Sequence, residues 1–342
     1  MIEKNVIKII ADVHCPWLRT PLSGQAKVAV KGDTLTITLP YYLGGYEAEY
    51  AERVQHACMV DKRNYSVEIK YQVPSYQTQL PNIKVHQVKN LIAVSSGKGG
   101  VGKTTTTCHL AWQLAKMGAR VGVFDADMYG PNVPLMMGTA SQEAHTTPNN
   151  QFMPIDCHGM STMSLAYLID PEKPMVWRGP MLSKTLLQIL MQTKWPPLDY
   201  LFIDLPPGTG DTQLTLAQKI PLTGAVVVTT PHPMAQADAL KGIKMFEKVN
   251  VPLFGQVVNM ASQACQQCGH VNDDLLAQAS TATTEQVSVL GQVPYAERYA
   301  RALGESEDNY HQTYDPIAAK LITNMVKLPK HRSSNIPTIT TE

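Results

Sequence analysis

Two lysines and four glycines share one short segment, VSSGKGGVGKTT, at residues 94–105. Within it, GKGGVGKT at residues 97–104 matches the phosphate-binding pattern GxxxxGK[ST]. Glycines let backbone N–H groups approach phosphate oxygens without an obstructing Cβ atom, and a following helix adds the positive end of its dipole. Lys103 would then bring a full charge to the β- and γ-phosphates, and the Thr104 hydroxyl would ligate Mg²⁺.

The surroundings of this segment support the same chemistry. An apolar strand, LIAVS, precedes it, and a helical sequence, TTTCHLAWQLAKMGA, follows it. The alternative is a glycine-rich turn between a strand and a helix that binds nothing. We predict an ATP site whose contacts come from Gly97, Lys98, Gly99, Gly100, Val101, Gly102, Lys103, Thr104 and Thr105.

Carboxylates follow two further apolar strands. Asp204 ends the strand in YLFIDLPPGTGD, where it would hold Mg²⁺ through water, and the Gly208 N–H would sense a γ-phosphate. A cap or turn is the alternative for Asp204. Asp125 and Asp127 follow the strand in VFDADMYGPN, at the strand ends where parallel sheets collect their ligands. We expect Asp127 to orient the attacking water and Asp125 to support it, because Asp125 still belongs to the apolar strand.

A pair of cysteines, Cys265 and Cys268, lies in NMASQACQQCGHVNDD. Two thiolates can hold one metal centre, but zinc and iron–sulfur clusters normally need four ligands. A symmetric dimer would supply the second pair at its two-fold axis. Zinc at the same four thiolates and a redox pair are the alternatives, although a redox pair would usually open a helix directly after a strand.

The chain is predicted to contain a small α+β domain at residues 1–80. VAVKGDTLTITLP has two alternating runs around Gly32-Asp33, which indicates a hairpin with a two-residue turn. Residues 47–61 carry apolar side chains at helical spacing, and SVEIKYQV alternates as a strand. The polar stretch that contains Pro74 and Pro81 indicates a linker, which we place at 81–90.

The remainder predicts an α/β P-loop NTPase domain at residues 91–330 and a polar tail at 331–342. Its apolar runs are unbroken, which favours a mostly parallel sheet buried between helices; they are LIAVS, VGVFD, YLFID, AVVVT and LFGQVV. The late helix AAKLITNMVKL should pack on this sheet rather than insert into a membrane.

Composition favours specific sites over a general electrostatic surface. The 342 residues include 29 Lys and Arg against 28 Asp and Glu, so no overall field favours nucleic acid or an anionic membrane as partner. The N-terminal sequence lacks a signal-peptide pattern, and we expect a cytoplasmic protein. Its six cysteines are too sparse for a disulfide scaffold and should be free thiols.

Five motifs within about residues 90–300 give the chain a specific family resemblance. They are SSGKGGVGKTT, FDADMYGPNVP with MMG soon after, VWRGPM at 176–181, LDYLFIDLPPGTGD at 198–211, and CQQC at 265–268. Together they resemble the Mrp/ApbC iron–sulfur cluster carriers. These belong to the deviant P-loop ATPases, which also include the MinD, ParA and NifH groups.

The resemblance implies a homodimer whose subunits face each other across their nucleotides. Lys98 would contact phosphate in the partner subunit, as an arginine finger does, rather than remain a solvated loop lysine. Cys265 and Cys268 of both subunits would hold a bridging [4Fe-4S] cluster. The cluster would pass to apo iron–sulfur proteins, with scaffold proteins as donors.

The chain also departs from the family pattern. It has Val258-Asn259-Met260-Ala261 where members usually have Glu-Asn-Met-Ser, although Asn259 could still read the adenine. It has no glycine between 270 and 290, where members are commonly glycine-rich. Two other functions therefore stay open: a MinD- or ParA-like positioning ATPase acting on membrane or DNA, and a zinc or nickel metallochaperone.

Overall fold

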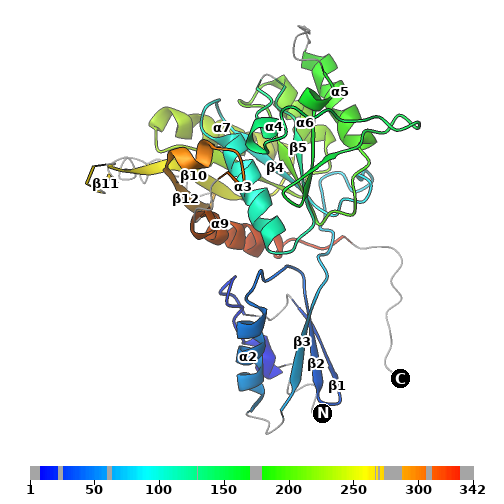
Figure 1. Cartoon of the computed structure of the whole chain (residues 1–342), viewed down its shortest axis with the longest axis vertical. Coiled ribbons are helices and arrows are strands. Elements are labelled where there is room, and N and C mark those ends of the chain that lie inside the picture. The colour runs from blue at the N-terminus through cyan, green and yellow to red at the C-terminus, as the bar shows by residue number, and fades with distance from the viewer. Residues whose placement is uncertain are drawn as a thin grey trace.

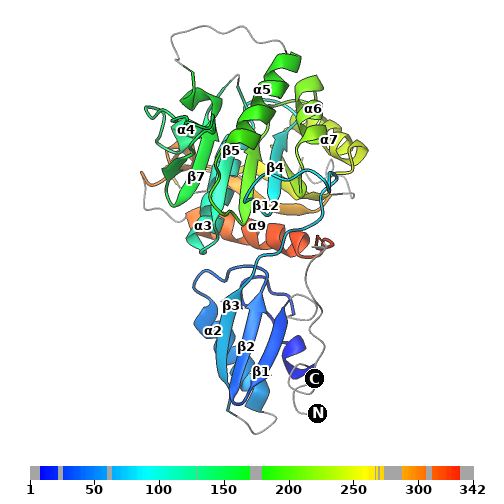
Figure 2. The ribbon, with the colours of Figure 1, turned by 90° about the vertical axis from the view of Figure 1, so that its right-hand side faces the viewer.

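The computed structural model shows a small N-terminal domain at one end of a larger α/β domain (Figures 1 and 2). The structure describes residues 8–21, 26–59, 64–128, 130–169, 179–265, 267–268, 270–272, 287–305 and 310–331. The long helix α9 (Tyr310–Met325) lies between the two domains. The expected division into an α+β part and a P-loop part is therefore visible, while the exact domain boundaries stay a prediction.

In the small domain a helix packs on a three-stranded sheet. The sheet order is β1 (Lys27–Lys31), β2 (Thr34–Leu39) and β3 (Ser66–Tyr71), and the helix is α2 (Glu47–Cys58). Lys31 pairs with Thr34, so the β1–β2 hairpin turns at Gly32-Asp33 as predicted, with Gly32 at φ +61°. The predicted apolar stripe of α2 is buried because it faces the sheet.

The described residues of the large domain form a nine-stranded sheet in the order β11-β10-β9-β4-β8-β5-β7-β6, with β12 on β10. All pairs are parallel except β6–β7 and β10–β11. The five predicted strands are confirmed. The bounds are β4 (Leu91–Ser96), β5 (Val121–Asp125), β6 (Ile155–Cys157), β7 (Met160–Ser164), β8 (Tyr200–Asp204), β9 (Gly224–Thr229), β10 (Leu253–Ala264), β11 (Val271–Asn272) and β12 (Val289–Tyr295).

Helices cover both faces of this sheet, which explains why its central strands are apolar without alternation. α3 and α9 bury one face, and α5, α6 and α7 bury the other. The bounds are α3 (Lys103–Lys116), α4 (Val133–Met136), α5 (Gly179–Gln192), α6 (Asp211–Lys219) and α7 (Pro233–Lys248), with short 3-10 turns at Leu165–Tyr167 and Glu297–Ala300. None of the described helices is both long and apolar enough to cross a bilayer.

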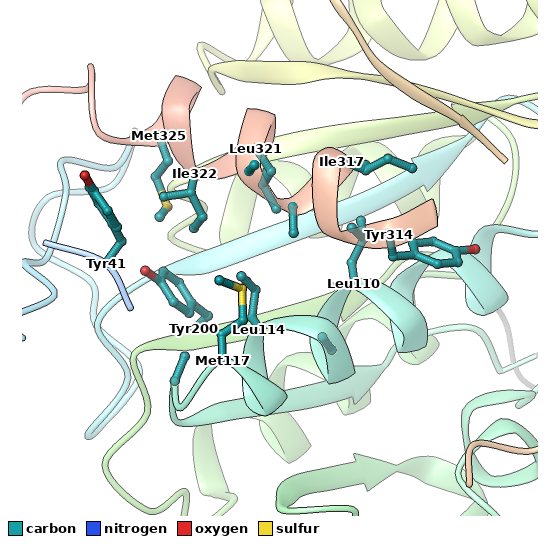
Figure 3. Packing of buried hydrophobic residues seen from close by; sticks show 14 of the residues in the cluster. Tyr41, Leu110, Leu114, Met117, Tyr200, Tyr314, Ile317, Leu321, Ile322 and Met325 are labelled. Carbon is teal, nitrogen blue, oxygen red and sulfur yellow. The ribbon is translucent and has the colours of Figure 1, made fainter. Parts of the chain in front are cut away.

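The two domains share one continuous apolar core (Figure 3). Tyr41 of the small domain belongs to the same buried cluster as Met117 at the end of α3 and Met325 at the end of α9. A Cβ at Gly44 would lie 2.6 Å from the Cγ of Met117, so the small domain packs closely on the last turn of α3. α9 therefore packs on the sheet, as predicted, and also contributes to the interdomain core.

The segment predicted as a linker is held firmly between the domains. Asn90 is fully buried; its amide donates to the Pro74 carbonyl at 2.9 Å, and its side-chain oxygen accepts the Tyr76 N–H at 3.1 Å. Close by, the buried Asp199 accepts hydrogen bonds from Lys89 and Arg120. These contacts fix how the small domain sits on the large one.

His109 gives the fold a testable pH dependence. It lies on α3, is 2% exposed, and stacks on Tyr314 of α9 with ring centroids 4.8 Å apart. Burial lowers its pKa from 6.5 to about 4. The unfolded chain therefore binds this proton more readily between pH 6.5 and 4, and stability falls as the pH drops through that window.

We expect His109→Phe to keep the ring stacking and remove this pH dependence. Between pH 7 and pH 4 the wild-type protein should lose up to about 3 kcal/mol of unfolding free energy more than the variant. Urea unfolding of both proteins at a series of pH values measures the difference. If the stability profiles of the two proteins run parallel with pH, folding does not lower the pKa of His109.

Candidate active site

The phosphate-binding loop, residues 97–102, joins β4 to α3 and depends on its glycines in two ways. Gly100 and Gly102 have φ of +78° and +83°, in the left-handed region that other residues rarely occupy. Gly97 is required by packing, because a Cβ there would lie 2.2 Å from the backbone carbon of Asp238 in α7. The loop is therefore shaped by local conformation at one end and by a neighbouring helix at the other.

Lys103 and Asp204 form a buried ion pair at the start of α3. The Lys103 Nζ lies 2.8 Å from Asp204 Oδ2 and 3.5 Å from Asp127 Oδ2, and the lysine is 6% exposed. Burial alone would lower the pKa of Lys103, but the attraction of Asp204 and Asp127 outweighs it and the pKa is raised. The site therefore keeps a charged lysine ready for phosphate.

Two threonine hydroxyl groups donate hydrogen bonds to the Asp204 carboxylate. Thr104 donates to Asp204 Oδ2 at 2.6 Å, and Thr107 donates to Oδ1 at 2.8 Å. A hydroxyl and a carboxylate this close form the hard oxygen set that Mg²⁺ prefers. The residues present therefore fit Mg²⁺, which would replace the charge of Lys103 beside Asp204 when the lysine turns to phosphate.

Asp125 and Asp127 have different surroundings in the structure. Asp125 is 2% exposed; it accepts the Asp127 N–H at 3.0 Å and the Ser164 hydroxyl at 3.1 Å. Burial and the charge of Asp204 raise the pKa of Asp125. Asp125 therefore shapes the turn, while Asp127 reaches toward Lys103. That Asp127 orients water stays a prediction.

Gly208, predicted to sense the γ-phosphate, is hydrogen-bonded to β4 in this structure. Its N–H donates to the Ser96 carbonyl at 2.9 Å, and its φ is +97°. The Ser96 hydroxyl in turn donates to the Lys98 carbonyl at 2.9 Å. Sequence reasoning missed Ser96, which links the Gly208 loop to the loop that carries Lys98.

Lys98 itself is partly exposed and has no carboxylate partner in the described part of the chain. Its contact with phosphate across a dimer stays a prediction.

Asn259 braces the phosphate loop from β10. Its side chain is 6% exposed and donates from Nδ2 to the Val101 carbonyl at 2.9 Å. A Cβ at Gly102 would lie 2.0 Å from the same nitrogen. Asn259 is thus next to the nucleotide site, as expected, but its amide holds the loop; its reading of adenine stays a prediction. No local sequence signal indicates this contact.

Cys265 and Cys268 lie in the exposed turn that joins β10 to β11. The Cys265 N–H donates to the His270 carbonyl at 2.8 Å. Backbone N–H groups of Cys268 and Gln267 donate to the Cys265 sulfur, and these bonds lower the pKa of the thiol. The described residues contain no cluster of three or more potential metal ligands, so this turn offers a metal centre two thiolates.

The remaining sequence expectations concern cysteines and motifs outside the site. None of the six cysteines, all of them within the described residues, forms a disulfide bond; Cys15, Cys58 and Cys108 are buried, and Cys157 is half-buried. Trp177 and Arg178 of the WRGPM motif and the segment 273–286 lie outside the described residues, so the structure adds nothing on them.

The chain matches known proteins over the region that contains these sites. A family model for ParA proteins, described as NUBPL iron-transfer P-loop NTPase, matches residues 87–328. The iron-sulfur cluster carrier protein of Escherichia coli (strain K12) is 52% identical over 268 residues, covering 76% of this chain and 73% of its own. The iron-sulfur cluster transfer protein NUBPL of Dictyostelium discoideum is 42% identical over 241 residues, covering 68% and 74%.

A solved structure extends the match to a nucleotide-bound relative. The nucleotide-binding protein of Archaeoglobus fulgidus, in complex with ADP, is 30% identical with a TM-score of 0.55, covering 69% of this chain and 89% of its own. The matched region of the family model includes the phosphate loop, the two acidic strand ends and the cysteine pair. The chain therefore belongs to the ParA family of NUBPL-type iron-transfer P-loop NTPases.

Proposed function

We propose that this protein is an ATP-hydrolysing iron–sulfur cluster carrier that acts as a homodimer. One observation carries the proposal: a single chain brings together a lysine, a threonine hydroxyl and a buried carboxylate that fit MgATP, and it also has an exposed pair of cysteines that is two ligands short of a cluster. The bacterial relatives named as iron-sulfur cluster carrier proteins support it. Recipients would be apo iron–sulfur proteins, and scaffold proteins would be the donors.

Because one chain supplies only two thiolate ligands, cluster binding would need a second subunit. In an isologous interface the same pair comes from each subunit, so four thiolates meet at the two-fold axis. Cys265 and Cys268 lie at an exposed hairpin turn, where a second copy could approach them. Zinc or nickel bound by the same thiolates is the metallochaperone alternative, which metal and sulfide analysis separates.

The acidic cluster suggests how hydrolysis would proceed. MgATP would draw Lys103 from Asp204 to the phosphates, and Mg²⁺ would take its place between Thr104 and Asp204. Asp127 would accept a hydrogen bond from the attacking water and aim its oxygen at the γ-phosphorus. Lys98 of the partner subunit would neutralise the charge that develops on the phosphate oxygens.

The cytoplasm is the compartment that we propose, because the six cysteines, all among the described residues, form no disulfide bond, which suits a reducing environment. Nucleic acid and membrane are not proposed as partners, since charge is balanced along the chain. A MinD- or ParA-like positioning role would instead show as ATP-dependent sedimentation with liposomes or DNA.

Replacing either cysteine of the pair should abolish cluster binding. After anaerobic reconstitution, the wild-type dimer should hold about four iron and four sulfide ions, and Cys265→Ser and Cys268→Ser should lose most of both. Cys157→Ser, which changes a half-buried thiol elsewhere, is the matched control. Iron and sulfide content unchanged in the two variants would refute the cluster assignment; zinc without sulfide in the wild type would favour the metallochaperone.

Lys98→Ala should lower the ATPase rate at least about 100-fold while ADP affinity changes little, because the charge acts in the transition state. Mixing subunits tests whether it acts across the dimer. In an equimolar mixture of Lys98→Ala with Lys103→Gln, about half the dimers are mixed and have one intact site, so about a quarter of the wild-type rate should return.

The matched control mixes Lys98→Ala with the double variant Lys98→Ala/Lys103→Gln, whose subunits offer no Lys98 to a partner. Its ATPase rate should stay at the level of the single variants. Equal rates in the two mixtures would show that Lys98 does not act in trans.

A further inference from the structure

Strand β10 runs from the nucleotide site to the cysteine pair. It has 12 residues, about twice the usual strand length. Asn259, in its middle, contacts the phosphate loop, and Cys265 directly follows its last residue. The end of β10 and β11 together project beyond the body of the large domain (Figure 1). One continuous segment thus connects the two halves of the function proposed above.

The contact at the nucleotide end is tight enough to transmit a movement. The Asn259 amide is hydrogen-bonded to the Val101 carbonyl and lies against Gly102. Val101 and Asn259 are buried, and Gly102 is half-buried. Val101 and Gly102 immediately precede Lys103, which must leave Asp204 to reach a phosphate. A rearrangement of this peptide on nucleotide binding therefore acts directly on β10.

An irregularity follows at once along the strand. Asn259 pairs with Val293 of β12 and Gln263 pairs with Tyr295, so four steps along β10 are matched by two along β12. Within this bulge Met260 has φ +54°, the left-handed conformation that a residue with a Cβ adopts at a cost of about 1 kcal/mol or more. The strand is bent and strained between the phosphate loop and the cysteines.

The two sides of the bulge are held differently. Residues 254–259 are buried; within them, residues 255–258 pair with β9 and residues 256–259 pair with β12. From Gln263 onward the strand is exposed, and its partners are the two residues of β11 and the last residue of β12. The part of β10 before the bulge is thus held in the sheet, whereas the part after it belongs to the exposed β10–β11 hairpin.

We propose that Asn259 is a positioning residue that couples the nucleotide state to the cysteine pair, with the Met260 bulge as the hinge. Occupancy of the phosphate loop changes the position of Asn259, and the bulge converts this change into a new orientation of Cys265 and Cys268. This coupling rests on the proposed function in one respect: if the protein carries a metal centre, ATP binding would change how the cysteines bind it. The coupling itself is a property of the metal-free chain.

The test measures thiol reactivity in the full-length, reduced, metal-free protein. Alkylation of Cys265 and Cys268 by iodoacetamide is followed by mass spectrometry without nucleotide, with MgADP, and with a non-hydrolysable MgATP analogue. In the wild type, nucleotide should change the alkylation rate at least about fivefold. In Asn259→Ala the rates with and without nucleotide should converge when the nucleotide concentration is raised until a binding titration of the same sample shows that the site is filled. Light scattering on the same samples separates this effect from a change in dimerisation.

Asn324→Ala is the matched control. Asn324 also donates an amide hydrogen bond to β10, to the Phe254 carbonyl at 2.7 Å, but at the end of the strand far from the bulge. This variant should retain the nucleotide response of the wild type. A loss of response equal to that of Asn259→Ala would mean that general weakening of β10, rather than the loop contact, is responsible.

A second variant tests the hinge without touching the phosphate loop. Met260→Gly relieves the left-handed strain and loosens the bend, so it should reduce the nucleotide response while leaving nucleotide affinity unchanged. A full response in both Asn259→Ala and Met260→Gly, or no response in the wild type, would overturn the coupling. Failure of the carrier proposal is distinguishable, because it would show as absent iron and sulfide after reconstitution whatever the alkylation rates.

Discussion

The structure of the site depends on the burial of one carboxylate. Asp204 is completely buried at the end of a central strand, and a carboxylate there is unstable unless its charge and its lone pairs are satisfied. Lys103, Thr104 and Thr107 satisfy them, and all three come from the first turn and a half of α3. This single group therefore fixes the helix to the sheet and holds the nucleotide-binding side chains in place before a nucleotide arrives.

The same helix connects the nucleotide site to the small domain. α3 begins at the phosphate loop and ends at Lys116; the next residue, Met117, packs closely against Gly44 of the small domain. Because the apolar core is continuous through this contact, the small domain cannot move freely with respect to α3. The arrangement differs from two domains joined by a flexible linker, and Asn90 and Asp199 reinforce it with buried hydrogen bonds.

Both candidate sites of the subunit leave chemistry unfinished. Lys98 has no carboxylate partner in the described chain, and the cysteine turn has two thiolates where a metal centre needs four. β10 brings these features together, because it braces the phosphate loop with Asn259 and then leads through a strained bulge to Cys265. An ATPase whose hold on a metal changes with nucleotide requires such a connection, and this strand is the most direct one.

Features that depend on neighbouring residues could be predicted from the amino-acid sequence. Unbroken apolar runs predicted the central strands, Gly32-Asp33 predicted the first hairpin turn, and the pattern at 97–104 predicted the phosphate loop, because each depends on local backbone preference or side-chain period. The contacts between distant groups, in contrast, are set by the fold. Asn259 contacts Val101 and Gly208 contacts Ser96 because strand order brings together residues that are far apart in the chain. The bulge at Met260 likewise depends on the register between β10 and β12.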